Sequence, residues 1–72
     1  EQHAIIEVAV PEDWQGRSIG ELDIRRRYGV NILGVKRENK TDVNISPETV
    51  LDADMTLLVL GENQKLKKHF RL

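Results

Sequence analysis

Runs of apolar residues along the chain predict a single sheet. The first run is rich in β-branched residues, has one wholly apolar face and stops at Pro11, which is typical of a strand. The last run is the most apolar, and we expect it to lie in the centre of the sheet. Including a short run that stops before Pro47, the predicted strands are AIIEVAV at 4–10, VNILGVKR at 30–37, VNI at 43–45 and MTLLVLG at 55–61.

The stretch between the first two runs carries the signals of a loop and then of a helix. The loop PEDWQGR has no periodicity, and we interpret its Trp14 as a hydrophobic plug over one edge of the core. Ser18 and Glu21 match a capping box, in which each residue satisfies a free backbone N–H of the other. They predict a helix over about 19–28, which Gly29 ends in a left-handed conformation.

This predicted helix has more apolar surface than one sheet can cover. Ile19 and Leu22 lie three residues apart, and Ile24 and Tyr28 lie four apart, so the helix carries two apolar ridges. We interpret Ile24 and Tyr28 as the surplus ridge and predict that they form a dimer interface.

The order of the predicted elements indicates the fold class. The terminal segment ENQKLKKHFRL predicts a second helix, with Leu66 and Phe70 at i, i+4 spacing and cations near its C-terminal end. The full order is then βαββ(turn)βα. Short connections between successive strands favour an α+β fold with a four-stranded, mostly antiparallel sheet and helices on one face. We interpret residues 1–72 as one domain and, because the chain starts at Glu1 without an initiator Met, expect it to be excised from a longer protein.

Length and charge narrow the class of partner. A chain of 72 residues buries only about 60% of its unfolded surface, so its core is marginal. The chain has no cysteine to reinforce it with a disulfide, and a homodimer is the usual alternative. The formal net charge of -1 argues against a nucleic-acid partner. No apolar run approaches the roughly 20 residues of a membrane helix.

No group of residues has the pattern of a catalytic or metal site. His3 and His69 are far apart, and neither has a second ligand at metal-binding spacing. Asp52 and Asp54 offer too few oxygens for calcium. Ser18 has no base beside it, and its capping role already explains it. We therefore predict a binding module and not an enzyme, with no metal or cofactor in this domain.

Three consecutive arginines in LDIRRRYGVNI, residues 22–32, concentrate cations in a nearly neutral chain. The residues alone leave two interpretations open. Glu21–Arg25 and Asp23–Arg27 are both at i, i+4 spacing and would each contribute about 0.2–0.5 kcal/mol as solvated pairs. Alternatively, one arginine binds an anion. Successive arginines lie about 100° apart around a helix, so they cannot all face one ligand.

The pattern as a whole resembles the C-terminal domain of RCK-type regulatory proteins, also called the TrkA-C domain. The segments GRSIGEL at 16–22 and PETVLDAD at 47–54 carry the likeness, which spans about 4–61. Ala53 stands where the family often has Gly, which concerns a turn and not a site. Within the family, LDIRRRYGVNI is most similar to the cytosolic gating-ring subunit of Ktr potassium-uptake systems.

The resemblance implies a function that composition and spacing do not. In this group the domain dimerises and binds cyclic di-AMP in the cleft between two protomers to control transport of potassium or another monovalent cation. It also implies an upstream nucleotide-binding Rossmann-type domain, an octameric ring in the full-length protein, and a membrane potassium channel or transporter subunit as partner. The expected location is then cytoplasmic, peripheral to the membrane.

Carried over position by position, the resemblance implies a ligand site. Ile19 and Ile32 correspond to aliphatic residues that pack adenine, and Arg25 to the arginine that contacts a phosphate. Asp23 corresponds to the carboxylate that orients this arginine or meets the base edge, and Asn31 to the polar residue beside the phosphate and ribose. Pro47 matches a proline contributed by the other subunit. The full implied set is Ile19, Asp23, Ile24, Arg25, Asn31, Ile32 and Pro47.

Two other hypotheses compete with ligand sensing. The domain could be a dimerisation module of a transporter or antiporter regulator that binds no small molecule. It could also bind nucleic acid through the basic helix, but the near-zero net charge and the single Tyr beside the arginines argue against that. A titration with cyclic di-AMP separates the first two hypotheses.

Overall fold

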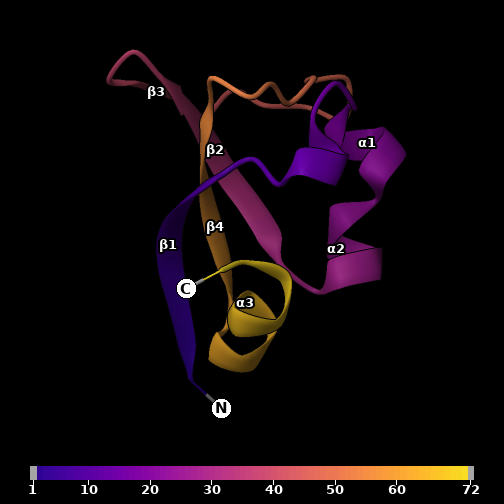
Figure 1. The fold of residues 1–72 in the computed structure, drawn as a ribbon, viewed down its shortest axis with the longest axis vertical. Helices are drawn as coiled ribbons and strands as arrows, with labels where there is room; N and C mark the ends of the chain where they lie inside the picture. Colours follow the sequence, from indigo (N-terminus) through magenta and orange to yellow (C-terminus); the bar gives the residue numbers. More distant parts are fainter. Residues whose placement is uncertain (1, 72) are drawn as a thin grey trace.

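A four-stranded antiparallel sheet organises the chain in a computed structural model that describes residues 2–71 (Figure 1). The strand order is β1-β4-β2-β3, so β4 is central, as predicted from its apolar sequence. The strands are β1 His3–Ala9, β2 Asn31–Arg37, β3 Lys40–Asp42 and β4 Thr56–Glu62. The connections hold a 3-10 turn, η1 Glu12–Trp14, and the helices α1 Ile19–Leu22, α2 Ile24–Tyr28 and α3 Asn63–His69.

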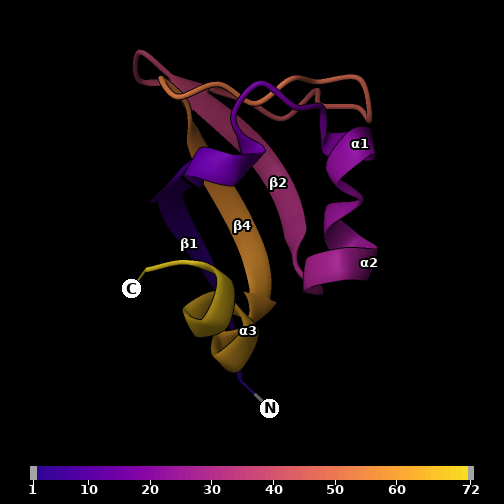
Figure 2. The same cartoon turned by 45° about the vertical axis from the view of Figure 1, so that its right-hand side comes forward.

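The helices lie on one face of the sheet, which confirms the α+β prediction (Figure 2). On β4, alternate residues such as Leu57 and Val59 are fully buried beneath them. Leu66 and Phe70, which the sequence placed on one side of the terminal helix, are both buried in the same core. The opposite face of the sheet is uncovered, and Ile5 there is 60% exposed.

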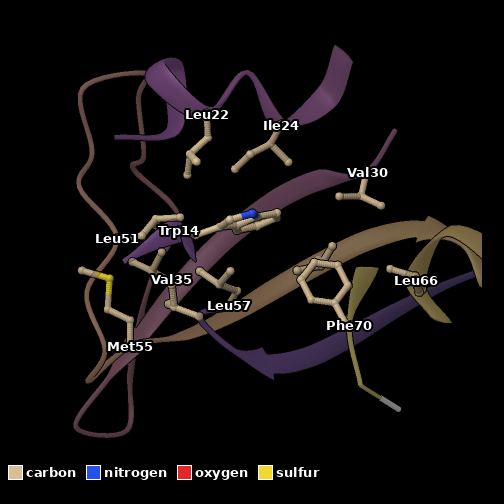
Figure 3. Close-up of a cluster of buried hydrophobic side chains, with 12 residues drawn as sticks. Trp14, Leu22, Ile24, Val30, Val35, Leu51, Met55, Leu57, Leu66 and Phe70 are labelled. Atoms are coloured by element: carbon tan, nitrogen blue, oxygen red, sulfur yellow. The ribbon is translucent and has the colours of Figure 1, made fainter. Parts of the chain in front are cut away.

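Trp14 fills the space between the helices and the sheet, so its predicted role as a hydrophobic plug is confirmed. Its side chain is 2% exposed and lies between Leu22 and Ile24 on one side and the strands on the other (Figure 3). Its ring contacts Tyr28 and Phe70, with ring centroids 5.0 and 5.5 Å apart. The indole thereby ties η1, α2 and α3 into one core.

The predicted strand over 43–45 is wrong, because the third strand comes earlier in the chain. Glu38 and Asn39 both adopt positive φ angles, 53° and 65°. These angles form the two-residue turn that matches the twist of a β-hairpin. Arg37 therefore pairs with Lys40, and β3 follows at once. The apolar residues of VNI instead belong to a loop, where Ile45 packs against the core and Val43 is 67% exposed.

The single helix predicted over 19–28 is also wrong, because Asp23 interrupts it. Asp23 has φ 51° and ψ 52°, a left-handed conformation that ends α1 and starts α2. Leu22 and Ile24 lie roughly 200° apart on a continuous helix and could not both face the sheet. With the interruption, each is only 3% exposed. The predicted surplus ridge therefore does not exist as such, since Ile24 belongs to the core of one protomer.

Candidate ligand-binding cleft

The residues implied as a ligand site come together on the surface of one protomer. They line a cleft of about 250 Å³ formed by α1, α2, the start of β2 and the loop before β4. The lining residues are Ile19, Gly20, Asp23, Ile24, Arg25, Val30, Asn31, Ile32 and Pro47. Every predicted ligand residue is among them, although they come from three separate parts of the sequence.

The interruption at Asp23 shapes the cleft. The backbone N–H of Asp23 donates to the carbonyls of Ile19 and Gly20, which closes α1, and its own carbonyl accepts from Arg27 N–H, which opens α2. The chain thus changes direction inside the cleft wall. Asp23 lines the cleft while its carboxylate pairs with Arg26.

Arg25 is held in place by a neutral partner. Its Nε donates a hydrogen bond to Oδ1 of Asn31, at 2.8 Å, which joins α2 to the first residue of β2. Among residues 2–71, no carboxylate forms an ion pair with Arg25. An arginine fixed through Nε still presents its terminal N–H groups, which suit a phosphate or carboxylate. The side chain is thus both oriented and available for an anion.

The predicted pairs Glu21–Arg25 and Asp23–Arg27 are wrong. Glu21 instead lies 3.9 Å from Arg17, and Asp23 pairs with Arg26. The i, i+4 rule assumes one continuous helix, and the left-handed residue at 23 turns α2 relative to α1. Of the three arginines, this leaves Arg25 directed into the cleft.

Close backbone contact brings Pro47 to the cleft. Gly20 N–H donates to the Pro47 carbonyl at 2.8 Å, and Ile19 N–H donates to that of Thr49 at 2.9 Å. A Cβ atom on Gly20 would lie 2.9 Å from the Cβ of Pro47, so a larger residue would push this loop away. Pro47 therefore lines the cleft of its own protomer, whereas the resemblance implied a proline from the other subunit.

Gly20 and Val30 line the cleft but were missing from the implied set. Val30 is fully buried at the base of the cleft and carries no polar signal. Gly20 had a signal in the sequence, because glycine inside a helix costs about 1 kcal/mol relative to alanine and often marks a close approach of two backbones.

Tyr28 faces away from this cleft and packs within its own protomer. Its ring contacts Trp14 and also His69, with centroids 5.0 Å apart in each case. Ile24 is buried and Tyr28 is half-buried within one protomer, so the two do not form an exposed ridge, and their place in a dimer interface stays a prediction.

Other kinds of site have little basis in the described part of the chain. Residues 2–71 contain no group of three or more metal-ligating side chains close enough to hold an ion. Asp52 and Asp54, weighed above as calcium ligands, both pair with Arg37 at 3.1 and 3.2 Å. None of the helices described is long and apolar enough to cross a membrane.

Comparison with known proteins settles the family. The sequence pattern of the TrkA-C domain matches residues 4–72. This chain belongs to the TrkA-C domain family. A relative of this TrkA-C domain is the Ktr system potassium uptake protein C of Bacillus subtilis, 31% identical over 61 residues, which are 85% of this chain and 28% of the relative. The chain spans about a third or less of the length of the curated relatives it matches.

Two solved structures resemble this TrkA-C domain closely. The RCK C domain of the potassium transport protein KtrA, in complex with cyclic di-AMP, has a TM-score of 0.82 and 33% identity, covering 93% of this chain and 79% of that one. The RCK_C domain dimer of S. agalactiae BusR, in complex with the same ligand, has a TM-score of 0.73 and 25% identity, covering 90% of this chain and 86% of that one.

Proposed function

We propose that this TrkA-C domain is a regulatory module of a potassium transporter that binds cyclic di-AMP across a homodimer. The observation that carries the proposal is the cleft that Arg25, oriented by Asn31, lines together with aliphatic side chains. The guanidinium suits a phosphate, and Ile19 and Ile32, both half-buried beside it, suit the apolar face of a base. The site thus offers one anion contact and one base contact within a single protomer.

The size of the cleft supports a dimer. Its volume of about 250 Å³ falls below the roughly 300–1,000 Å³ of most small-molecule pockets. Cyclic di-AMP has two phosphates and two adenines related by a two-fold axis. An isologous dimer would present the same patch twice about such an axis, so each protomer would hold one half of the ligand. The complexes of the KtrA and BusR domains with cyclic di-AMP support this ligand, and the BusR domain in its complex is a dimer.

The wider assembly is part of the proposal. The likeness to a potassium uptake protein supports a role in transport of potassium or another monovalent cation. We infer that the full-length protein carries an upstream Rossmann-type domain, assembles as an octameric ring, and acts in the cytoplasm on a membrane channel or transporter subunit. Cyclic di-AMP is then a regulatory ligand and not a cofactor.

Calorimetric titration of the 72-residue chain with cyclic di-AMP tests the proposal. We expect saturable heat with one ligand bound per two chains. Cyclic di-GMP is the matched comparison, because it has the same symmetry and phosphates and differs only at the edges of its bases. No heat from cyclic di-AMP, together with a dimer in sedimentation, would instead support a ligand-free dimerisation module. Equal affinity for both dinucleotides would show that the cleft binds the phosphates and the apolar face of a purine without selecting adenine.

A further inference from the structure

A second cleft, on the other side of α2, is lined by cations. It lies between α2 and α3 and has a volume of about 360 Å³. The charged side chains that line it are all basic, namely Arg26, Arg27, Lys65 and Lys68, and the imidazole of His69 lies beside them. Tyr28, Gly29 and Gln64 complete the lining. The cleft for cyclic di-AMP shares none of these residues.

Most of these cations have no acidic partner in the described chain. Within residues 2–71, Arg26 pairs with Asp23, but Arg27, Lys65 and Lys68 form no ion pair. This local excess of unpaired cations does not follow from the composition, because the chain has 12 acidic and 11 basic residues. The α3 segment Asn63–His69 contains three lysines, two of which face the cleft, and no acid.

The surrounding structure holds these cations close together. The Lys65 side chain lies over Gly29, so that a Cβ there would be 2.9 Å from Lys65 Nζ. The Arg27 guanidinium lies 5.6 Å from the centroid of the Tyr28 ring. The same ring contacts His69 edge-on, 5.0 Å away. The contacts of the Tyr28 ring with Arg27 and His69, and of Lys65 with Gly29, thus bring side chains of α2 and α3 to one cleft.

The surroundings of His69 lower its pKa, through burial first and then through two lysines of the cleft. Burial lowers the pKa of His69, and the positive charges of Lys68 and Lys65 lower it further. Other charged groups near this imidazole are Arg27 across the Tyr28 ring, and Glu12, Asp13 and Arg71 around a separate hollow that His69 also lines. A bound anion in the basic cleft would offset the repulsion among these cations.

We propose that the cleft between α2 and α3 is a second binding site, specific for a phosphate group. Arg27, Lys65 and Lys68 bring one guanidinium and two ammonium groups to this cleft without an ion-pair partner in residues 2–71. Such groups bind phosphate in proteins. The phosphate comes either from a small soluble molecule or from the headgroup of an anionic lipid. This site goes beyond the proposed binding of cyclic di-AMP, because it uses Arg27 and Lys68 and not Arg25.

His69 provides a local readout for diphosphate as a probe. Proton NMR resolves its imidazole, and His3, the other histidine of the chain, serves as an internal control. Diphosphate is added at constant ionic strength, balanced with sodium chloride. We expect a saturable shift of the His69 signal and a rise in its pKa, with no change at His3. A shift that does not saturate, or that is equal at both histidines, overturns the proposal.

A pair of adjacent lysines on α3 provides the matched variants. Lys68 lines the basic cleft, whereas Lys67 lines a different surface with Gln2 and Glu62. Lys68→Gln should weaken diphosphate binding about fivefold or more, and Lys67→Gln less than about twofold. Equal losses of diphosphate affinity in the two variants would show that the attraction is diffuse and would overturn the proposed site. Far-UV circular dichroism verifies that both variants are folded.

Two further experiments complete the test. The first distinguishes a lipid phosphate from a soluble one, and the second distinguishes this site from the proposed site for cyclic di-AMP. Sedimentation with phosphatidylglycerol vesicles, with phosphatidylcholine vesicles as control, assigns the site to a lipid headgroup if Lys68→Gln loses binding and Lys67→Gln keeps it. Binding of diphosphate without binding of vesicles assigns it to a soluble phosphate. Arg25→Ala should lower the affinity for cyclic di-AMP about a hundredfold or more and leave the shift of His69 by diphosphate unchanged. Loss of both in Arg25→Ala would overturn a separate second site.

Discussion

Removal of the Arg25 side chain is the most direct perturbation of the proposed nucleotide site. Arg25→Ala deletes the guanidinium that Asn31 orients at 2.8 Å. A hydrogen bond that involves a charged group contributes about 1.5–3 kcal/mol. A symmetric dimer loses two such contacts with each ligand, so the loss in binding free energy is about 3–6 kcal/mol. Affinity for cyclic di-AMP should then fall by a factor of about a hundred or more.

Arg27→Ala is the matched control, because it removes the same charge from the same helix. Arg27 does not line the nucleotide cleft and lies over the Tyr28 ring on the other side of α2. We expect less than about a threefold change in affinity, as for a distant exposed charge. Stability should change little in both variants, since both side chains are exposed.

Titration calorimetry with each variant measures the difference, and urea unfolding verifies the fold. Equal losses in Arg25→Ala and Arg27→Ala would show that net charge, and not geometry, attracts the nucleotide. Unchanged affinity in Arg25→Ala would refute the assigned phosphate contact. Asn31→Ala refines the comparison: the guanidinium stays but loses its fixed orientation, so we expect an intermediate loss of about tenfold.

Three further predictions concern the core, the cleft wall and pH. Ile24→Ala should lower the free energy of unfolding by about 2–5 kcal/mol in urea titrations, because Ile24 is buried within one protomer; a loss below about 0.5 kcal/mol, typical of surface sites, would contradict this placement. In Gly20→Ala the new Cβ would lie 2.9 Å from the Cβ of Pro47, so the loop should be displaced and calorimetry should show weaker binding of cyclic di-AMP, with an unchanged far-UV spectrum. Unchanged affinity would show that the loop can move without any effect on binding. The pKa of His69 is lowered in the folded state, so the unfolded chain binds more protons, and the free energy of unfolding should fall as the pH drops from above 6.5 through the folded pKa. In urea unfolding, His69→Gln should show a smaller fall in this free energy over the same pH range.

The sequence predicts most of the sheet because the apolar patterns there match the burial. The central position of β4 follows from its composition, and the predicted ends of β1 and β2 agree to within a residue or two. The third strand was misplaced because VNI has an apolar pattern but packs as a loop, while the preceding polar segment KTD forms the strand. A hairpin turn at Glu38 and Asn39, with no glycine to mark it, decided the outcome.

The ligand residues could be found only through the family resemblance, since no spacing rule links α1, β2 and the loop of Pro47. The left-handed backbone conformation of Asp23 could not be predicted from the sequence. The capping box and Gly29 mark a helix at both ends, and nothing between them signals an interruption. That one residue explains why the predicted ion pairs do not form and why Ile24 is buried, because both expectations assumed regular helical spacing.

The packing of Trp14 gives the domain a built-in optical signal. It is the only tryptophan in the chain, and its fluorescence comes from a ring that is 2% exposed. That ring contacts Tyr28 at the end of α2 and Phe70 just after α3. Since α2 borders both clefts and α3 borders one, a shift of either helix alters the surroundings of a single chromophore. Emission could therefore follow occupancy of each cleft in unlabelled protein, on the millisecond scale of stopped-flow mixing.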